Sequence, residues 1–481
     1  MRKRILYIVI LLLGFQISCT DDFTKMNVDK TSPEEVSASV LLTNAQIEII
    51  DQISSTNVNY NTWKLMAQYW TERSYRDEAN YNITSREIPE QIFRVYYAAL
   101  YDLKNAYEII EAQTPVAPNL DYKQKTKANQ LAVIDLINVF VYQRLVDIFG
   151  DIPYTEALDK DNYTPAYDDA QTIYKDLIDR AEAAVAALDE DGDSFGSADL
   201  IYSGDIASWT KFGNSLLVKM GIGIADGPLS ALGQSTVEAH YDGVFASQDE
   251  SAFFPYEKSL PYVNELYDDL VASGRSDFVM VTGMVSLMES IDDPRIDNYF
   301  DDLDGITTDY GASGGSYSTK VHYDAALNEP DFPGFFLTYD EVQFYLAEAA
   351  ARGWAVGSSA EEFYNAAVTA SIVQWGGTVA EADTYLAAQS YSSYDVWKDA
   401  IGTQAWLAMY TRGFIGYTFW RRLDYPSVLV MPPSPPTGVT SIPVRFTYPT
   451  NEQQYNSVNW KAASDAIGGD EMSTKLFWDI Y

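Results

Sequence analysis

The sequence predicts a mainly all-α fold, in which tetratricopeptide-like helix pairs form a scaffold and long, loop-rich irregular segments lie between and after them. Three observations predict it. Residues 338–376 place apolar side chains on one face of a helix, turn at a Gly-Ser-Ser tripeptide, and repeat the pattern. Residues 123–149 and 167–188 form a second such pair, interrupted by a Gly-Asp-Ile-Pro stop. Residues 227–337, by contrast, show no sustained period.

The first helix within 338–376 has the clearest pattern in the chain. Apolar and small residues recur there at i, i+3, i+4, i+7 and i+8, namely Val342, Tyr345, Leu346, Ala349 and Ala350. Its partner helix begins where two adjacent glutamates, at 361 and 362, place carboxylates in the first turn, which the helix dipole favours. Aromatic residues alternate with alanine, so the two helix axes can approach closely. This stretch therefore predicts a pair of closely packed helices that belongs to the structural scaffold.

The remaining elements follow in chain order. We predict helices at 36–53, 63–71, 91–111, 208–223 and 394–410, and a short helix near 458–466. A Pro-rich stretch after Tyr425 predicts irregular backbone towards the end of the chain. No stretch has the composition of a linker between independent folds. We therefore predict one helical domain over 36–481, with irregular inserted segments at about 227–337 and 425–481.

The N-terminus has the pattern of an export signal. Three basic residues precede an apolar run at 5–15, which is shorter than the ~20 residues that a membrane-spanning helix needs. The only cysteine, Cys19, follows a small residue at the expected cleavage point, and this arrangement resembles a bacterial lipoprotein signal. We predict that 1–18 is removed, that Cys19 is lipidated, and that 19–35 is a flexible polar tether. The alternative is an ordinary secreted protein with a free thiol.

Composition excludes several classes of function. The formal net charge is −37, and it becomes −40 without the three basic residues of the leader. Such a charge repels phosphate backbones, so we expect no nucleic-acid binding. With two histidines and one cysteine, the chain offers no His-rich or Cys-rich metal site, and we predict neither a metal nor a cofactor. The acidic turn 189–196 lacks the glycine and glutamate positions of an EF-hand loop.

Several ordered motifs together resemble the SusD/RagB family, the nutrient-binding outer-membrane lipoproteins of the Bacteroidetes. They are FGDIPYTEAL at 149–158, DLIYSGDIASWTKFGNSLLVKM at 199–220, DDPRIDNYF at 292–300, LTYDEVQFYLAEAAARGW at 337–354 and FWRRLDYP at 419–426. Each motif is weak by itself, but their order behind a lipoprotein-like leader is specific.

The resemblance implies an α-helical fold with four tetratricopeptide-like helix pairs and an irregular part that shapes the ligand site. It implies an oligosaccharide or a peptide as ligand, and a SusC-like TonB-dependent transporter as partner. It also implies a lipid-anchored outer-membrane protein that faces the cell exterior. Asp21 and Asp22, directly after Cys19, resemble the acidic export signal of surface lipoproteins in this group.

We sought ligand-binding residues among exposed aromatic side chains in irregular segments. A sugar ring packs its C–H face on tyrosine or tryptophan, while its hydroxyl groups need polar side chains at the edge. Two stretches fit, and the candidates are Trp70, Tyr75, Arg76, Asn80 and Tyr81 in the first and Tyr310 and Tyr317 in the second. The stretch around Tyr391 and Tyr394 fits less well. The alternative is that these residues form ordinary surface loops or contact the transporter. We expect Arg295, Arg421 and Arg422 to be buried structural residues.

Three functions remain open on the sequence alone. The favoured one is a non-catalytic binding lipoprotein that captures oligomeric nutrients and delivers them to a transporter. A surface hydrolase that uses two carboxylates is the first alternative, because 69 acidic residues always supply some close pair. Against it, the chain has no H-E-x-x-H or Walker-type motif. A purely structural or adhesion lipoprotein is the second alternative.

Overall fold

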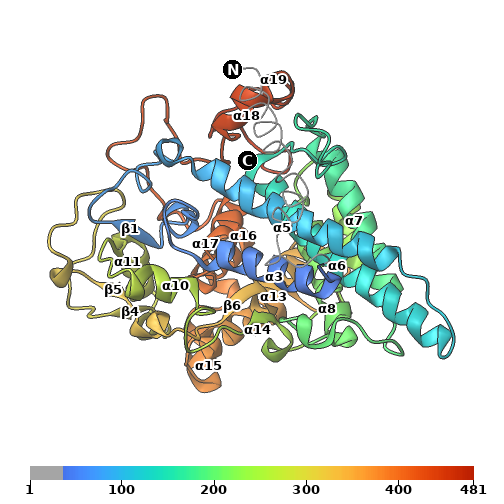
Figure 1. Cartoon of the computed structure of the whole chain (residues 1–481). Coiled ribbons are helices and arrows are strands. Elements are labelled where there is room, and N and C mark those ends of the chain that lie inside the picture. Colours follow the sequence, from blue (N-terminus) through green and yellow to red (C-terminus); the bar gives the residue numbers. More distant parts are fainter. Residues whose placement is uncertain (1–35, 481) are drawn as a thin grey trace, which may run out of the picture. The chain divides into compact units, whose positions relative to one another are not determined.

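The computed structural model describes residues 36–480 (Figure 1). The elements described here belong to one compact unit that begins at Ala38. The predicted signal peptide, the lipidation site at Cys19 and the tether 19–35 lie outside the described residues. Within 36–480, no helix combines the length and the apolar character that crossing a bilayer requires.

The first half of this unit is a succession of helices, each of which packs against the next. They are α3 (Ala38–Ser54), α5 (Ile88–Glu111), α6 (Leu120–Phe149), α7 (Ala170–Ala187), α8 (Ile206–Gly223) and α9 (Ser230–His240). Asp169 and Asp205 cap α7 and α8, because each side chain accepts a hydrogen bond from a backbone N–H in the first turn.

The second half repeats this organisation. Its helices are α13 (Tyr339–Ala351), α14 (Ala360–Gln374), α15 (Val379–Ala388), α16 (Trp397–Ala408) and α17 (Gly413–Leu423). Helices α13 and α14 pack as a pair, as do α16 and α17, and α13 also packs against α8 of the first half. A buried ion pair joins the halves, with Lys219 Nζ 3.0 Å from Glu341 Oε1. The predicted mainly helical, tetratricopeptide-like scaffold is therefore confirmed.

Short strands and helical turns occupy the irregular segments. Three antiparallel two-stranded ribbons are β1 (Trp70–Glu72) with β3 (Phe278–Met280), β2 (Ala252–Phe254) with β6 (Gly334–Leu337), and β4 (Phe300–Asp301) with β5 (His322–Tyr323). The short helices are α4 (Trp63–Met66), α10 (Glu265–Tyr267), α11 (Thr282–Ser290), α12 (Ile296–Tyr299), α18 (Thr450–Tyr455) and α19 (Ser457–Ala466). Single turns include η2 (Thr84–Arg86) and η6 (Tyr317–Thr319).

Two sequence expectations need correction. The helix predicted at 63–71 ends at Met66, because Gln68 adopts a left-handed backbone (φ 57°) and the chain then pairs as β1 with β3. The region 227–337 is not uniformly irregular, since it contains α9 and α11. Two further helices, α15 and α17, form at 379–388 and 413–423, where no helix is predicted from the sequence.

Buried arginines hold the core together, as predicted for Arg295, Arg421 and Arg422. Arg295 Nη2 lies 2.6 Å from Asp293 Oδ2, and both side chains are fully buried. Arg421 donates a 2.8 Å hydrogen bond to the carbonyl oxygen of Asp147 at the end of α6. Arg445, from the C-terminal segment, donates to the carbonyl oxygen of the last residue of α6 over 2.8 Å. These two guanidinium groups satisfy carbonyls that the helix leaves unpaired at its C-terminus.

Candidate ligand-binding site

Three segments that are distant in the sequence meet beside β1 (Figure 1). They are 73–82, 309–315 and 430–436. Arg76 Nη1 donates to the carbonyl oxygen of Gly311 over 2.6 Å, and the backbone N–H of Ser434 donates to Asn80 Oδ1 over 3.2 Å. The meeting point bounds a hollow of about 390 Å³, which we call the loop site. Its lining residues are Tyr75, Arg76, Asp77, Asn80, Asn82, Ser434 and Pro436.

Two buried carboxyl groups fix the fold of segment 73–82. Glu72 Oε2 accepts a 3.0 Å hydrogen bond from the backbone N–H of Ala79, and Glu78 forms an ion pair with Arg86. Burial and the neighbouring Glu78 raise the pKa of Glu72, and burial raises the pKa of Glu78 as well, against the nearby charge of Arg86. The segment therefore returns on itself and presents the residues between these two glutamates to the outside.

Segment 309–315 approaches its neighbours so closely that glycine is required. Gly311 has φ +69°, and a Cβ atom there would lie 2.6 Å from Pro432 Cβ. At Gly314, a Cβ atom would lie 2.3 Å from Arg73 Cβ. The glycine-rich composition thus serves close packing of the three segments.

Of the seven sequence candidates, three line the loop site. Tyr75 is 75% exposed, Arg76 is half-buried, and Asn80 is buried with its amide donating to the carbonyl oxygen of Arg76 over 2.7 Å. Tyr317 is half-buried and lies outside the lining. Its ring stacks on His322 at 4.0 Å, and the Arg73 guanidinium lies 5.9 Å from it.

The expectation of exposed rings is wrong for Trp70, Tyr81 and Tyr310, which are 0%, 0% and 2% exposed. Trp70 Nε1 donates to the hydroxyl of Tyr410 over 2.9 Å. The Tyr81 hydroxyl accepts from Gln68 over 2.9 Å, and its ring lies 5.8 Å from that of Tyr310. The long-range packing of the irregular segments covers these three rings. These three rings therefore lie in the protein interior and are not part of the lining of the loop site.

Asn82, Ser434 and Pro436 also line the loop site and are not among the residues predicted from the sequence. Asn82 lies one residue beyond the chosen stretch, and its side chain donates to Asp77 Oδ1 over 3.1 Å. The other two residues belong to the Pro-rich segment. That segment was expected to be irregular, but local sequence does not indicate that it lies against 73–82.

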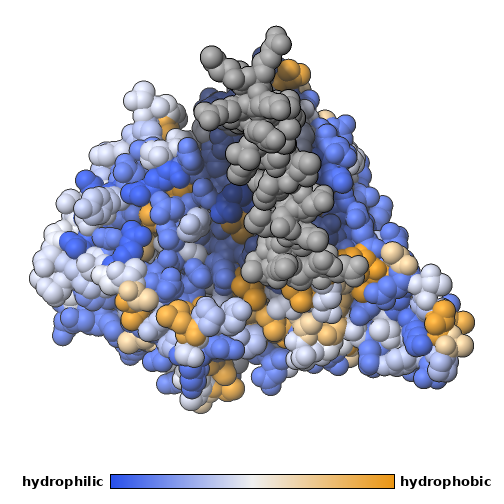
Figure 2. Space-filling model, in the orientation of Figure 1, coloured by the Kyte–Doolittle hydropathy of each residue, from blue (hydrophilic) through white to orange (hydrophobic). Residues whose placement is uncertain are grey.

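A larger cavity of about 680 Å³ lies elsewhere, between the β2–β6 ribbon and the end of α14. Aromatic rings dominate its lining, and Phe253, Phe332, Phe335 and Trp375 supply most of them. In Figure 2 the surface over the loop segments is mainly hydrophilic, whereas apolar residues gather along the lower edge, where Figure 1 places α14, α15 and β6. The apolar cavity and the polar loop site therefore differ in chemistry.

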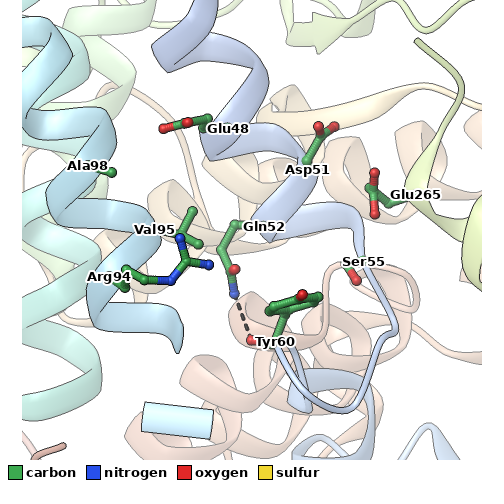
Figure 3. Close-up of a pocket in the computed structure, with 9 residues that line it drawn as sticks. All are labelled: Glu48, Asp51, Gln52, Ser55, Tyr60, Arg94, Val95, Ala98 and Glu265. Atoms are coloured by element: carbon green, nitrogen blue, oxygen red, sulfur yellow. Dashed lines mark hydrogen bonds between the residues drawn. The ribbon is translucent and has the colours of Figure 1, made fainter. Parts of the chain in front are cut away.

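An acidic pocket of about 260 Å³ lies between α3 and α5 (Figure 3). Asp51 on α3 and Glu265 on α10 bring their carboxyl groups near each other, and Arg94 on α5 points into the same space. Burial raises the pKa of Asp51 to about 6, against a hydrogen bond from Tyr256 that lowers it. Burial, together with the charge of Asp51, raises the pKa of Glu265 to about 8. Among residues 36–480, no three His, Cys, Asp or Glu side chains are grouped so as to hold a metal ion.

Comparisons with known proteins identify the family of the chain. The profile of the SusD-like family, described as starch-binding and associating with the outer membrane, matches residues 30–449. No curated protein gives a significant match. A solved chitin-binding protein is 25% identical with a TM-score of 0.80, over 92% of this chain and 100% of its own.

Two further solved structures share the fold. A chitin-binding SusD homologue from Flavobacterium johnsoniae is 22% identical with a TM-score of 0.75, over 92% of this chain and 98% of its own. A SusD homologue from Bacteroides thetaiotaomicron is 21% identical with a TM-score of 0.76, over 93% of this chain and 100% of its own. Because the family profile spans most of its length, the chain belongs to the SusD-like family of binding proteins associated with the outer membrane.

Proposed function

We propose that this protein is a non-catalytic cell-surface lipoprotein that binds an oligosaccharide at the loop site and delivers it to a SusC-like TonB-dependent transporter. The observation that supports the site is Tyr75, whose ring is 75% exposed beside amide, guanidinium and carboxylate groups. An exposed ring can stack on the C–H face of a sugar. The polar groups of Arg76, Asp77 and Asn82 at its edge can then pair with the sugar hydroxyls.

Glycan is preferred over peptide as the ligand for two reasons. The family is described as starch-binding, and a relative of 25% identity is a chitin-binding protein. Peptides commonly bind by adding a strand to a free sheet edge. The paired strands of residues 36–480 are only two to four residues long, so they offer little edge for that mode.

The anchoring and the partner follow from the leader and the family. Cys19 is the proposed attachment point of the lipid, and the outer-membrane association of the family supports this location. Replacing Cys19 by Ala is expected to move the protein from the membrane fraction to the soluble fraction. A SusC-like transporter is expected to co-purify with the wild-type protein from detergent-solubilised outer membranes.

The acidic pocket is the observation that favours the alternative, a hydrolase. Asp51 and Glu265 are neighbouring carboxyl groups whose pKa values are both raised and differ from each other, as in an acid–base pair. The family consists of binding proteins, which supports the non-catalytic proposal.

A binding and turnover assay distinguishes these functions. The purified full chain is titrated calorimetrically with neutral oligosaccharides and with peptides, and each mixture is then analysed chromatographically for products. Saturable binding of an oligosaccharide without product supports the proposal. Product that disappears in Glu265→Gln would establish the hydrolase. Binding of peptides alone would replace the ligand class, and co-purification of a transporter without any ligand binding would favour a structural role.

A further inference from the structure

A second hollow lies next to the loop site. This hollow, of about 240 Å³, shares the lining residues Asn82 and Pro436 with the loop site, so these two residues form the edge between the two hollows. Its walls come from η2, from the loop 436–441 and from 471–473. Together the two hollows reach the size range of protein ligand pockets, roughly 300–1,000 Å³.

We infer that this second hollow, which we call the distal subsite, binds further units of the same chain and selects neutral, hydroxyl-rich oligosaccharides over polyanionic ones. The inference rests on the proposed function, because the loop site must bind the first units. Beyond the proposed function, it states that the bound oligosaccharide extends from the loop site into the distal subsite. It also states that affinity increases with oligosaccharide length and that polyanionic oligosaccharides are rejected.

The junction between the two hollows is held in place by hydrogen bonds. The backbone N–H of Asn82 donates to the carbonyl oxygen of Asp77 over 2.8 Å, and its side chain is held by the carboxylate of the same residue. Pro436 opens a turn in which the backbone N–H of Val439 donates to its carbonyl oxygen over 3.1 Å. A chain that crosses from one hollow to the other therefore meets a preorganised edge.

The distal subsite is lined mainly by hydroxyl groups. The exposed side chains of Thr84, Thr437, Thr440, Ser441 and Ser473 belong to its wall. Within residues 36–480, no hydrogen bond engages the hydroxyl group of any of the five, although other serine and threonine hydroxyls of the chain are paired. A hydroxyl group can both donate and accept, as a sugar hydroxyl does. The wall thus offers a row of unpaired groups that match a polyhydroxylated chain.

Charge supplies the selectivity. Glu471 is the one side chain with a formal charge among the residues that line the distal subsite, and it forms no ion pair within residues 36–480. Its carboxylate can accept hydrogen bonds from adjacent sugar hydroxyls, but it repels a carboxylate or sulfate group on the ligand. In the loop site, the two side chains with a formal charge, Arg76 and Asp77, are of opposite sign, so its lining offers no net positive charge to an anion. The net charge of −37 adds to the repulsion of polyanions.

The test compares a disaccharide with a hexasaccharide of one neutral series, using the full chain and calorimetry. The parent is expected to bind the hexasaccharide more tightly. Ser473→Trp, which fills the distal subsite, is expected to lower hexasaccharide affinity about tenfold, or about 1.4 kcal/mol, and to leave disaccharide affinity unchanged. Ser392→Trp is the matched control, because Ser392 is also exposed and lies outside both hollows. Thermal melting verifies that each variant is folded.

A charge reversal gives a second measurement. Glu471→Lys is expected to bind a uronic-acid oligosaccharide that the parent rejects, and to weaken binding of the neutral hexasaccharide. The inference is overturned if the hexasaccharide binds the parent no more tightly than the disaccharide does. It is equally overturned if Ser473→Trp weakens both ligands alike, or if Glu471→Lys leaves rejection of the uronic-acid chain intact. Failure of every oligosaccharide to bind the parent would instead overturn the proposed function.

Discussion

The guanidinium of Arg76 donates a 2.6 Å hydrogen bond to the carbonyl oxygen of Gly311, a residue 235 positions further along the chain. The bond ties segment 309–315, which does not itself line the loop site, to segment 73–82, which does, at a point where Gly311 has a left-handed backbone and little free space. A hydrogen bond from a charged donor contributes roughly 1.5–3 kcal/mol. The bond therefore sets how firmly segment 309–315 is held against the lining segment.

Removing this bond gives the first prediction. Arg76→Ala is expected to speed amide hydrogen exchange across 309–315 and to weaken oligosaccharide binding several-fold, with little change in the global melting temperature, because only a local tie is lost. Exchange mass spectrometry and calorimetry measure the two effects. If oligosaccharide affinity falls while amide exchange in 309–315 stays unchanged, Arg76 acts by contacting the ligand rather than by holding segment 309–315 in place.

Tyr75 provides the second prediction. Tyr75→Ala is expected to lower oligosaccharide affinity roughly tenfold, because it removes an aromatic stacking surface worth about 1–1.5 kcal/mol. Stability should change by less than about 0.5 kcal/mol, because the ring is exposed. Tyr455→Ala is the matched control, since that ring is also 75% exposed and lies outside the loop site. Equal affinity in both variants would contradict the site assignment.

The aromatic cavity gives a third, discriminating prediction. Phe332 lines that cavity, with its ring 5.8 Å from Phe335 and 6.2 Å from Trp375. Because this cavity is distinct from the loop site, Phe332→Ala is expected to leave oligosaccharide affinity unchanged. Calorimetric titration of Phe332→Ala and of Tyr75→Ala with the same oligosaccharide measures the two affinities. Lost binding in Phe332→Ala, with retained binding in Tyr75→Ala, would move the site to the aromatic cavity.

Trp70 gives the fourth prediction, which concerns stability. Its ring lies 5.2 Å from that of Tyr323 and 5.6 Å from that of Phe278. Trp70→Ala is expected to cost about 3–5 kcal/mol in the free energy of unfolding, because it leaves a large cavity and removes the hydrogen bond that the Tyr410 hydroxyl accepts. Denaturant titration measures this loss. Trp70→Phe, which preserves most of the packing, should recover much of it, and a neutral effect of Trp70→Ala would contradict the burial of the ring.

The acidic pocket gives the fifth prediction. Glu265 has a pKa raised to about 8 by burial and by Asp51, Asp269 and Asp268, so the folded protein retains a proton that the unfolded chain releases. Stability is therefore expected to fall as pH rises from about 4.5 to about 8, and to level off above that range. Asp51 contributes in the same direction up to pH about 6. Melting curves across this range measure the slope.

The variant Glu265→Gln isolates this contribution. It is expected to raise the melting temperature at pH 8 by on the order of 2 °C and to flatten the profile between pH 6 and 8, because the amide carries no charge to bury. Glu329→Gln, at an exposed glutamate, is the control. A profile in Glu265→Gln as steep as that of the parent would show that other groups cause the pH dependence.

Local sequence patterns were sufficient for the scaffold helices. The apolar spacing within 338–376 predicted a pair of helices, which the structure shows as α13 and α14. The signal for α15 was also present, because Thr378 and Glu381 form a capping box directly after a Gly-Gly pair. Local sequence is therefore sufficient to predict α15 as well. The strand β1 differs, because its partner β3 lies about 200 residues away and no local pattern reveals the pairing.

Burial within the loop site could not be predicted for a related reason. Trp70 and Tyr75 occur five residues apart in one polar, aromatic segment, yet one ring is buried and the other is exposed. The difference arises from Phe278, Tyr323 and Tyr410, which come from distant parts of the chain. Composition identifies such a segment as a candidate. Only tertiary packing decides which ring faces the solvent.

The arginines at the C-terminal end of α6 have a mechanical consequence. Arg421 bonds to that helix end and also to the carbonyl oxygen of Val444, while Arg445 bonds to the last carbonyl of α6. The segment between Pro436 and Thr447, which forms one wall of the distal subsite, is thus held by hydrogen bonds at the end of a helix of 30 residues. The position of this segment therefore depends on the position of the C-terminal end of α6, although the two are far apart in the sequence.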